Sequence, residues 1–279
     1  MVRQQNWKQI QRHYGDRDIA QRIIDRLHEA GYDLDNLSRD DTSSFDEFHG
    51  GGRTSTLALA KFAGFSSGLH VLDLGSGVGG PARSLAAEYA CIVTGLELTG
   101  EFVRAGKMLT DLLGLSTEVD FVQASATEIP FKAEVFDIVW SQNMLMNVSD
   151  KEQLFREAFR VTKPGGKFAF ETVVAGSSGA PHYPTFWATD PNMNFLVSAK
   201  EMQTLGIGAG FREVSFKDNT DDVIANGRRR LQVAKAGGVA ELDLSVIVTT
   251  EVAEKMENSV CNNIEGRTGA VQALFQRPG

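Results

Sequence analysis

A short apolar run that ends in a glycine cluster constrains this chain more than any other feature. Residues 69–74 form the run, and Gly75, Gly77 and Gly80 follow at G-x-G-x-x-G spacing before a helical pattern over residues 81–89. Glycines permit a tight turn and a close backbone approach, and the N-terminus of the next helix offers free N–H groups. Strand, glycine turn and helix in this order predict a cradle for a nucleotide-like ligand.

Two acidic residues narrow the kind of ligand. Asp73 precedes the first glycine by two positions, where a dinucleotide-binding turn is usually apolar. A carboxylate there suits a ligand with an ammonium group, such as the methionine end of S-adenosylmethionine. Residues 91–97 form a second predicted strand that ends in Glu97. This acid follows the glycines by roughly 20 residues, where ribose hydroxyls need an acceptor.

Strand and helix patterns alternate along the rest of the chain. Further strands are predicted over residues 119–124, 136–141, 167–174, 212–217 and 270–276. The last of them would pair antiparallel at the edge of the sheet. This alternation predicts an α/β fold with a doubly wound, mostly parallel sheet of seven strands. Ligands in such sheets bind beyond the carboxyl ends of the strands, and the polar residues expected there are Ser76, Glu97, Ser125 and Asn143.

The sheet is expected to carry additional segments around its ligand site. Residues 1–53 should form an N-terminal helical cap that ends in a glycine turn at residues 50–52, and residues 54–279 should form the core. Within that core, residues 175–197 and 221–264 should act as lid segments that contact the second substrate. Consecutive glycines at 50–52 would let the backbone fold close against a ligand.

Composition excludes several classes of protein. The net charge of −8 disfavours the basic footprint of a nucleic-acid-binding protein. Cys91 and Cys261 form neither a disulfide framework nor a metal-ligand spacing. No apolar run approaches the roughly 18 residues of a membrane span, and the N-terminus lacks a signal-peptide pattern. We therefore expect a cytoplasmic monomer or homodimer that acts on a small molecule, without a metal, nucleic acid or membrane.

The chain resembles the class I S-adenosylmethionine-dependent small-molecule methyltransferases over nearly its whole length. The resemblance is closest to the branch similar to sarcosine/dimethylglycine N-methyltransferases. The segments that carry it are residues 46–53, the glycine motif at 71–80, 125–131, 140–143, the Lys-Pro-Gly-Gly turn at 163–166, and 187–197. The resemblance implies a Rossmann-like fold, S-adenosyl-L-methionine as cofactor with S-adenosyl-L-homocysteine as product, and methyl transfer to nitrogen or oxygen of a small metabolite.

The resemblance also implies roles for individual residues. Glu97 would bind the ribose hydroxyls, Leu98 would lie against the adenine, and Asn143 would face the methyl group and the sulfonium. The implied cofactor-binding residues are Asp73, Gly75, Ser76, Gly77, Glu97, Leu98, Ser125, Ala126, Ser141 and Asn143.

This chain departs from the branch at two positions. The branch often has an aspartate where this chain has Asn143, and a histidine where it has Asn147. Two neutral amides offer hydrogen bonds without charge or basicity. We therefore expect neither a glycine-derived amine as the acceptor nor a base at this position.

Methyl transfer from a sulfonium is an in-line displacement in which the protein mainly positions the nucleophile and excludes water. A hydroxyl acceptor usually needs a base, and the candidate bases are His49 and His182. Asn143 is the third candidate catalytic residue, because it would face the methyl group and the sulfonium. His49 could instead form a structural hydrogen bond that orders the glycine turn. His182 could instead be an exposed loop residue without a catalytic role. An acceptor bulkier than glycine is indicated by an aromatic and apolar set consisting of Tyr14, Met146, Tyr183, Phe186 and Trp187.

Two other functions fit parts of the pattern. An NAD(P)-dependent oxidoreductase uses similar glycine spacing, but Asp73 and the Lys-Pro-Gly-Gly turn disfavour it. A non-catalytic module that binds S-adenosylmethionine is compatible with Asn143 and Asn147.

Overall fold

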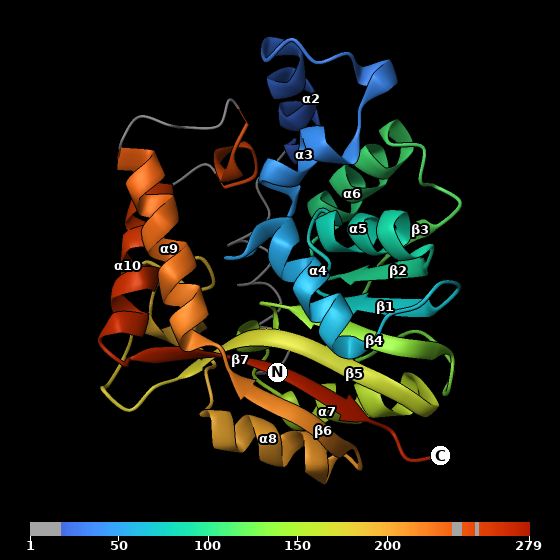
Figure 1. Ribbon diagram of the computed structural model, residues 1–279, viewed down its shortest axis with the longest axis vertical. Coiled ribbons are helices and arrows are strands. Elements are labelled where there is room, and N and C mark those ends of the chain that lie inside the picture. Colours follow the sequence, from blue (N-terminus) through green and yellow to red (C-terminus); the bar gives the residue numbers. More distant parts are fainter. Residues whose placement is uncertain (1–17, 236–241, 249–250) are drawn as a thin grey trace.

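The computed structural model describes residues 18–235, 242–248 and 251–279. Its centre is a seven-stranded sheet with the strand order β3-β2-β1-β4-β5-β7-β6 (Figure 1). The strands are β1 (His70–Leu74), β2 (Ile92–Glu97), β3 (Val119–Gln123), β4 (Phe136–Gln142), β5 (Thr162–Ala175), β6 (Arg212–Asp218) and β7 (Thr268–Gln276).

The pairing of the strands confirms the predicted doubly wound, mostly parallel α/β sheet. Strand β1 pairs in parallel with β2 and β4, β2 with β3, and β4 with β5. Strand β7 is antiparallel to both of its neighbours, β5 and β6. It lies second from the edge, and β6 is the outermost strand.

Burial explains why β7 takes the inner place. Most residues of β7 are buried, whereas those of β6 are exposed or half-buried. An apolar strand such as β7 buries more of its surface when it pairs with a strand on each side. The charged sequence of β6, with Arg212 and Lys217, suits an unpaired edge.

Helices cover both faces of the sheet because adjacent residues of each strand point to opposite sides. In β1, Val71 packs with α4 (Gly52–Ala63) and α5 (Gly80–Tyr89). Leu72 and Leu74 pack with α7 (Lys151–Val161) and α8 (Ala199–Gly208) on the other face. Each strand of the centre is therefore apolar on both faces, as a doubly wound fold requires.

The described part of the N-terminal segment packs on the outside of these helices. Helix α2 (Ile19–Glu29) buries Ile19, Ile23 and Leu27 against α6 (Gly100–Leu112). Helix α3 (Arg39–Asp46) follows and leads into the glycine turn before α4. This arrangement places the end of α3 beside the start of α5 (Figure 1).

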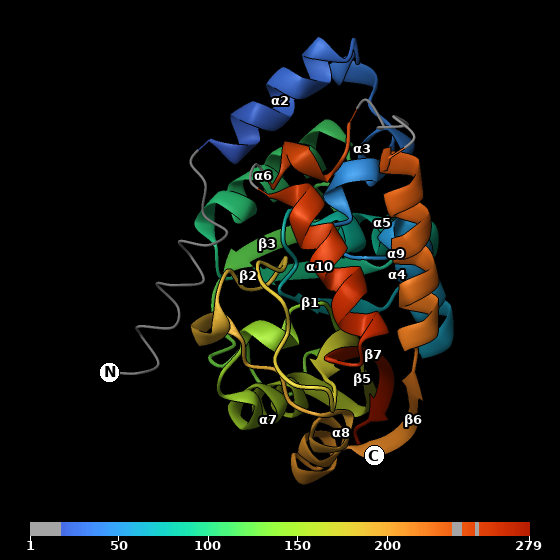
Figure 2. The ribbon, with the colours of Figure 1, turned by 90° about the vertical axis from the view of Figure 1, so that its left-hand side faces the viewer.

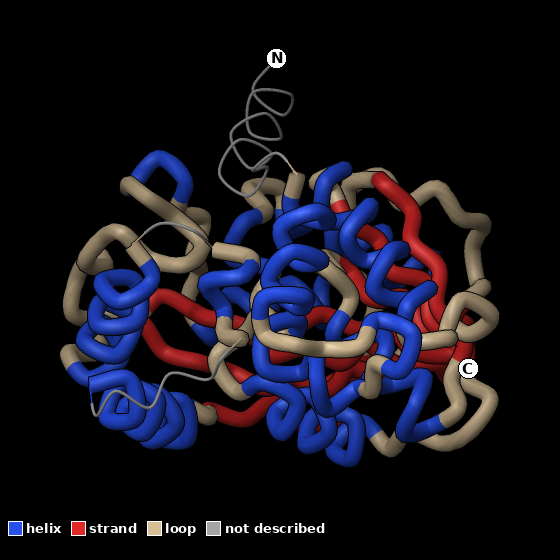
Figure 3. Tube along the Cα trace, turned by 90° about the horizontal axis from the view of Figure 1, so that it is seen from above, coloured by secondary structure: helices blue, strands red, loops and turns tan. Residues whose placement is uncertain are grey.

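A pair of antiparallel helices stands at one end of the molecule. It consists of α9 (Thr220–Lys235) and α10 (Val252–Ile264), which run side by side (Figure 2) and lie to one side of the helices that cover the sheet (Figures 1 and 3). Gly227 permits their close approach, since a Cβ there would lie 2.6 Å from Cγ2 of Val260. None of the helices in the described ranges combines the length and the hydropathy that a membrane span needs.

The contact between α5 and the end of α3 generates a testable prediction. A Cβ added to Gly80 would lie 2.3 Å from the carbonyl oxygen of Asp46, which is backbone and cannot rotate away. We expect Gly80→Ala to lower the free energy of unfolding by about 1–3 kcal/mol, the usual cost of overpacking. Urea denaturation of the purified protein measures this value.

Gly208 provides the matched control, because it is also helical and no atom lies within 4 Å of its added Cβ. Gly208→Ala should be neutral or stabilising by up to about 1 kcal/mol through helix propensity. Equal effects of the two substitutions would show that the contact between α3 and α5 is loose.

Candidate functional site

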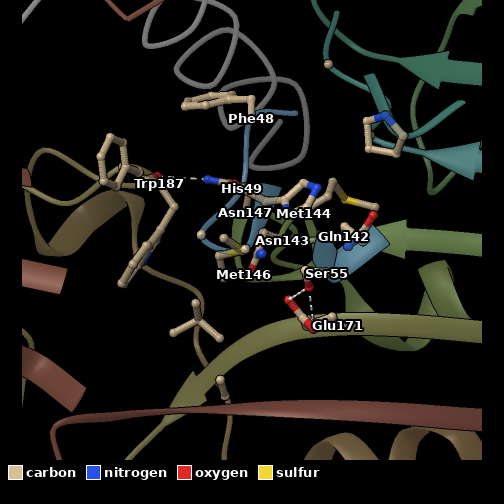
Figure 4. A pocket seen from close by; sticks show the side chains of 18 of the residues that line it. Phe48, His49, Ser55, Gln142, Asn143, Met144, Met146, Asn147, Glu171 and Trp187 are labelled. Carbon is tan, nitrogen blue, oxygen red and sulfur yellow. Dashed lines mark hydrogen bonds between the residues drawn. The ribbon is translucent and has the colours of Figure 1, made fainter. Parts of the chain in front are cut away.

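A cavity of about 760 Å³ opens at the carboxyl ends of β1, β2, β4 and β5. Its walls also include the glycine turn before α4 and the segment around Trp187 (Figure 4). Both helices of the α9–α10 pair contribute lining residues as well. The four polar residues that the sequence places at strand ends all line it: Ser76, Glu97, Ser125 and Asn143. Their convergence is therefore confirmed.

The glycine turn after β1 has the backbone that its sequence predicts. Gly75 and Gly77 adopt positive φ angles of 71° and 55°, which favour glycine. A Cβ on Gly75 would lie 2.2 Å from Cγ of Met144, while no atom lies within 4 Å of one on Gly77. The turn is thus packed on one side and open to the cavity on the other.

Glu97 is held at the end of β2 by backbone donors. Gly77 N donates to its Oε2 at 3.0 Å, and Thr99 N donates to its Oε1 at 2.8 Å. Burial raises the pKa of Glu97, although these two N–H groups oppose the rise. Glu97 also lines the cavity, so its carboxylate can accept hydrogen bonds from a ligand there.

Asp73 is a buried carboxyl group with an unpaired oxygen. It is 2% exposed and is not itself among the residues that line the cavity. Its Oδ2 has no hydrogen-bond partner within the described part of the chain. Burial raises the pKa of Asp73 to about 8, and the carboxylates of Glu47 and Glu97 add to the rise. An approaching cation would pair with this carboxylate and favour its ionised form.

Apolar residues line the cavity beyond Glu97. Leu98, Phe102 and Ala126 lie there, next to the polar Ser125. Ser141 does not, because its side chain is fully buried and Oγ donates to the carbonyl of Leu74 at 3.0 Å. The expectation that Ser141 contacts a ligand is wrong for this reason, and its hydroxyl instead ties β4 to the end of β1.

A network of buried charges supports the wall next to α4. Arg39 donates to Asp46 Oδ2 at 2.6 Å and to Glu47 Oε1 at 3.2 Å, and Arg83 donates to Asp46 Oδ2 at 2.8 Å. Burial by itself would raise the pKa of Glu47. That pKa instead lies well below its usual range. His49 lowers it through a hydrogen bond and through charge, Ser84 through a hydrogen bond and Arg39 through charge.

His49 belongs to this network and also lines the cavity. Its Nε2 lies 3.1 Å from Glu47 Oε2 and 3.0 Å from Thr56 Oγ1. The Thr56 hydroxyl is in turn 3.0 Å from Gln142 Oε1. These contacts favour the structural interpretation of His49, in which the ring orders the glycine turn. Its buried Nδ1 has no partner among the described residues.

Asn143 follows β4 in a conformation that few residues adopt. Its φ is 52°, in the left-handed region that asparagine tolerates better than most other residues. Its backbone N–H donates to the carbonyl of Glu171 at 2.8 Å, which holds this conformation in place. Strained backbone of this kind clusters at functional sites.

Three of the five residues predicted to contact the acceptor line the cavity. Met146, Phe186 and Trp187 line the cavity, and Asn147 Nδ2 donates to the carbonyl of Trp187 at 2.8 Å. Tyr183 does not line it, because its ring packs in the cluster behind Met146 and Trp187. Tyr14 lies outside the described residues.

The structure also corrects the expectation for His182. Its side chain is 43% exposed, and Nε2 lies 2.8 Å from Oε2 of Glu265. Asn262 of α10 binds both the backbone N–H and the carbonyl of His182. These contacts keep the ring outside the cavity, so it cannot act as a base on a ligand there.

Several lining residues escaped the sequence analysis. They include Ser55, Gln142, Glu171, Asn219 and Arg230. The sequence pattern that could have identified Glu171 is an acidic residue near the carboxyl end of an apolar strand, next to Phe170. Arg230 gave no usable signal, because arginine runs usually form a solvated helix face. Its Nη1 donates to the carbonyl of Gly50 at 3.1 Å and thereby ties α9 to the glycine turn.

The chain is similar in sequence to known methyltransferases. Residues 72–170 match the family described as a methyltransferase domain. The chain is 31% identical to sarcosine/dimethylglycine N-methyltransferase of Halorhodospira halochloris, over 71% of this chain and 70% of that protein. It is 27% identical to glycine/sarcosine/dimethylglycine N-methyltransferase of Actinopolyspora halophila, over 71% of this chain but only 35% of that protein.

A solved structure agrees with the fold over nearly the whole chain. The geranyl diphosphate C-methyltransferase of Streptomyces coelicolor A3(2) superposes with a TM-score of 0.69 at 16% identity, covering 98% of each chain. At this identity the likeness concerns the fold alone.

The buried charge network generates a prediction about stability. Arg39→Ala leaves Asp46 and Glu47 without one of their buried cations. Breaking a buried ion pair on one side typically costs about 3–5 kcal/mol, and we expect a loss of this size in the free energy of unfolding. Urea denaturation at neutral pH measures it.

Arg53 provides the matched control, since it also contacts two carboxylates, those of Asp40 and Glu88, at the surface. Arg53→Ala should cost less than about 1 kcal/mol, because solvent screens exposed pairs. If Arg39→Ala is no more destabilising than Arg53→Ala, the buried network does not hold this wall.

Proposed function

This chain belongs to the class I S-adenosylmethionine-dependent methyltransferases, and we propose that it transfers a methyl group to nitrogen or oxygen of a small-molecule metabolite. One observation carries the proposal: the glycine turn with Glu97 and the apolar wall with Trp187 border the same cavity. With a volume of about 760 Å³, this cavity lies within the usual range for small-molecule sites. A cofactor and an acceptor can therefore meet inside it.

The cofactor is S-adenosyl-L-methionine, and residues of this site fit its chemical groups. The unpaired Oδ2 of Asp73 would accept hydrogen bonds from the ammonium group. The open space at Gly77 would admit the ribose, with Glu97 as the acceptor for its hydroxyls. The proposed set around the methionine end, the ribose and the adenine is Asp73, Gly75, Ser76, Gly77, Glu97, Leu98, Ser125 and Ala126.

The residues of this chain mainly position the acceptor and exclude water. When bound, the cofactor supplies a methyl group on a sulfonium that is already a good leaving group. We propose that Asn143, held by its bond to Glu171, lies next to that methyl group. Met146, Phe186 and Trp187 would keep water from the nucleophile and align it for in-line attack.

Thermal unfolding with added ligands tests the assignment. S-adenosylmethionine and S-adenosylhomocysteine should raise the melting temperature of the wild type by mass action, and NADH should not. We expect Asp73→Asn to weaken S-adenosylhomocysteine binding about ten- to a hundredfold, the usual value of a hydrogen bond to a charged group. Asp120→Asn, at an exposed strand position, is the control with unchanged binding. Stabilisation by NADH alone would contradict the proposal.

The raised pKa of Asp73 predicts that cofactor binding depends on pH. With a pKa of about 8, Asp73 is mostly protonated in the free protein at pH 7. An ammonium group pairs only with the ionised form, so binding at pH 7 should release close to one proton. Affinity for S-adenosylhomocysteine should rise by up to about tenfold per pH unit between roughly pH 6 and 8.

Calorimetric titration in two buffers with different ionisation enthalpies measures the released proton. The same titration of Asp73→Asn should show no proton release that depends on this residue and an affinity that is nearly constant over that pH range. Proton release that persists in Asp73→Asn would assign it to another group.

A further inference from the structure

Glu171 is a buried carboxylate that faces the cavity from the carboxyl end of β5. It is 6% exposed and is among the lining residues. Ser55 Oγ, from α4, lies 3.1 Å from both carboxylate oxygens, and Asn219 Nδ2 donates to Oε2 at 3.3 Å. Figure 4 shows the contact with Ser55 at the base of the cavity.

These partners leave the carboxylate with unused acceptor capacity. Two carboxylate oxygens offer about four lone-pair sites, and one hydroxyl and one amide do not fill them. Within the described ranges, no cationic side chain forms an ion pair with Glu171. A buried carboxylate without a counter-charge is costly, so a cation supplied by a ligand would stabilise it.

The other acids along this cavity do not offer the same site. Asp46 already pairs with two arginines, Arg39 and Arg83. Asp150 accepts a hydrogen bond from Gln153 N at the start of α7, and Asp222 is exposed. Glu97 lies on β2, at the other side of the glycine turn. Glu171 is instead the neighbour of Asn143, through the backbone bond between them. It therefore lies where the acceptor is proposed to bind.

The surroundings of Glu171 select the rest of such a ligand. Met146, Phe48 and Trp187 line the same cavity, and Figure 4 shows Phe48 and Trp187 on the side away from Glu171. Apolar and aromatic walls favour a ligand with a hydrophobic body. An ammonium group at Glu171 with an apolar body toward Trp187 suits both the carboxylate and these walls.

We propose that Glu171 binds the amino group of the methyl acceptor, and that the acceptor is an apolar amine. This inference rests on the proposed function and selects nitrogen as the methylated atom. For transfer, the proton on nitrogen passes to Glu171 and the nitrogen lone pair forms the bond to the methyl carbon. The electron pair of the broken carbon–sulfur bond remains on sulfur.

Calorimetry on the protein saturated with S-adenosylhomocysteine tests this site. The probes are tryptamine and N-methyltryptamine, with tryptophol as the neutral counterpart of similar shape. The wild type should bind each amine at least about tenfold more tightly than tryptophol, the value of one charge-assisted hydrogen bond. Glu171→Gln should lose this preference and retain its affinity for S-adenosylhomocysteine within about twofold.

Glu254→Gln is the matched control, because it removes the same charge from an exposed position on α10. It should keep both the amine preference and the cofactor affinity. Ser55→Ala is a second variant for the case in which Glu171→Gln does not fold. It removes one hydrogen bond to the carboxylate and should change the amine preference by about three- to tenfold.

Three results would overturn the inference: amines that bind the wild type no better than tryptophol, a preference that survives in Glu171→Gln, or a loss confined to cofactor binding. The last result would place Glu171 at the cofactor and not at the acceptor. Failure of the proposed function is distinct, since the wild type would then not bind S-adenosylhomocysteine at all.

Discussion

The site depends first on a set of charges that the fold removes from water. Arg39 and Arg83 hold Asp46 and Glu47 where the end of α3 meets the start of α5. Gly80 permits this contact because it carries no side chain. From Glu47 the hydrogen bonds continue through Thr56 to Gln142 at the end of β4. One network thus joins the N-terminal segment, the glycine turn before α4 and the sheet.

The buried acids near the cavity differ because their partners differ. Glu47 is surrounded by donors and cations, which keep its pKa low. Asp73 has an unpaired oxygen and lies near other carboxylates, so its pKa is raised to about 8. Among the described residues, Glu171 has only the neutral donors Ser55 and Asn219. We infer that the first acid stabilises the fold, whereas the other two are completed by cationic groups of the ligands.

Local pattern predicted much of the cavity around the glycine turn and Glu97, but little of the part around Trp187 and Glu171. The glycines and Glu97 belong to one strand–turn–helix–strand unit, whose geometry follows from short-range sequence. Ser141 was misplaced because the sequence shows that it ends a strand but not which way its hydroxyl turns. His182 and Tyr183 were misplaced because contacts with α10 and with a packed cluster set the path of their loop.

Local sequence is enough to predict the order of strands and helices along the chain, the parallel sheet, and the turn at which the glycines permit positive φ. These follow from periodicity and from the conformations open to each residue type. Long-range packing places β7 inside β6 and brings Ser55 and Asn219 to Glu171 across separations of 116 and 48 residues. Such contacts depend on how whole elements pack, because burial and charge are shared among segments that no local pattern connects.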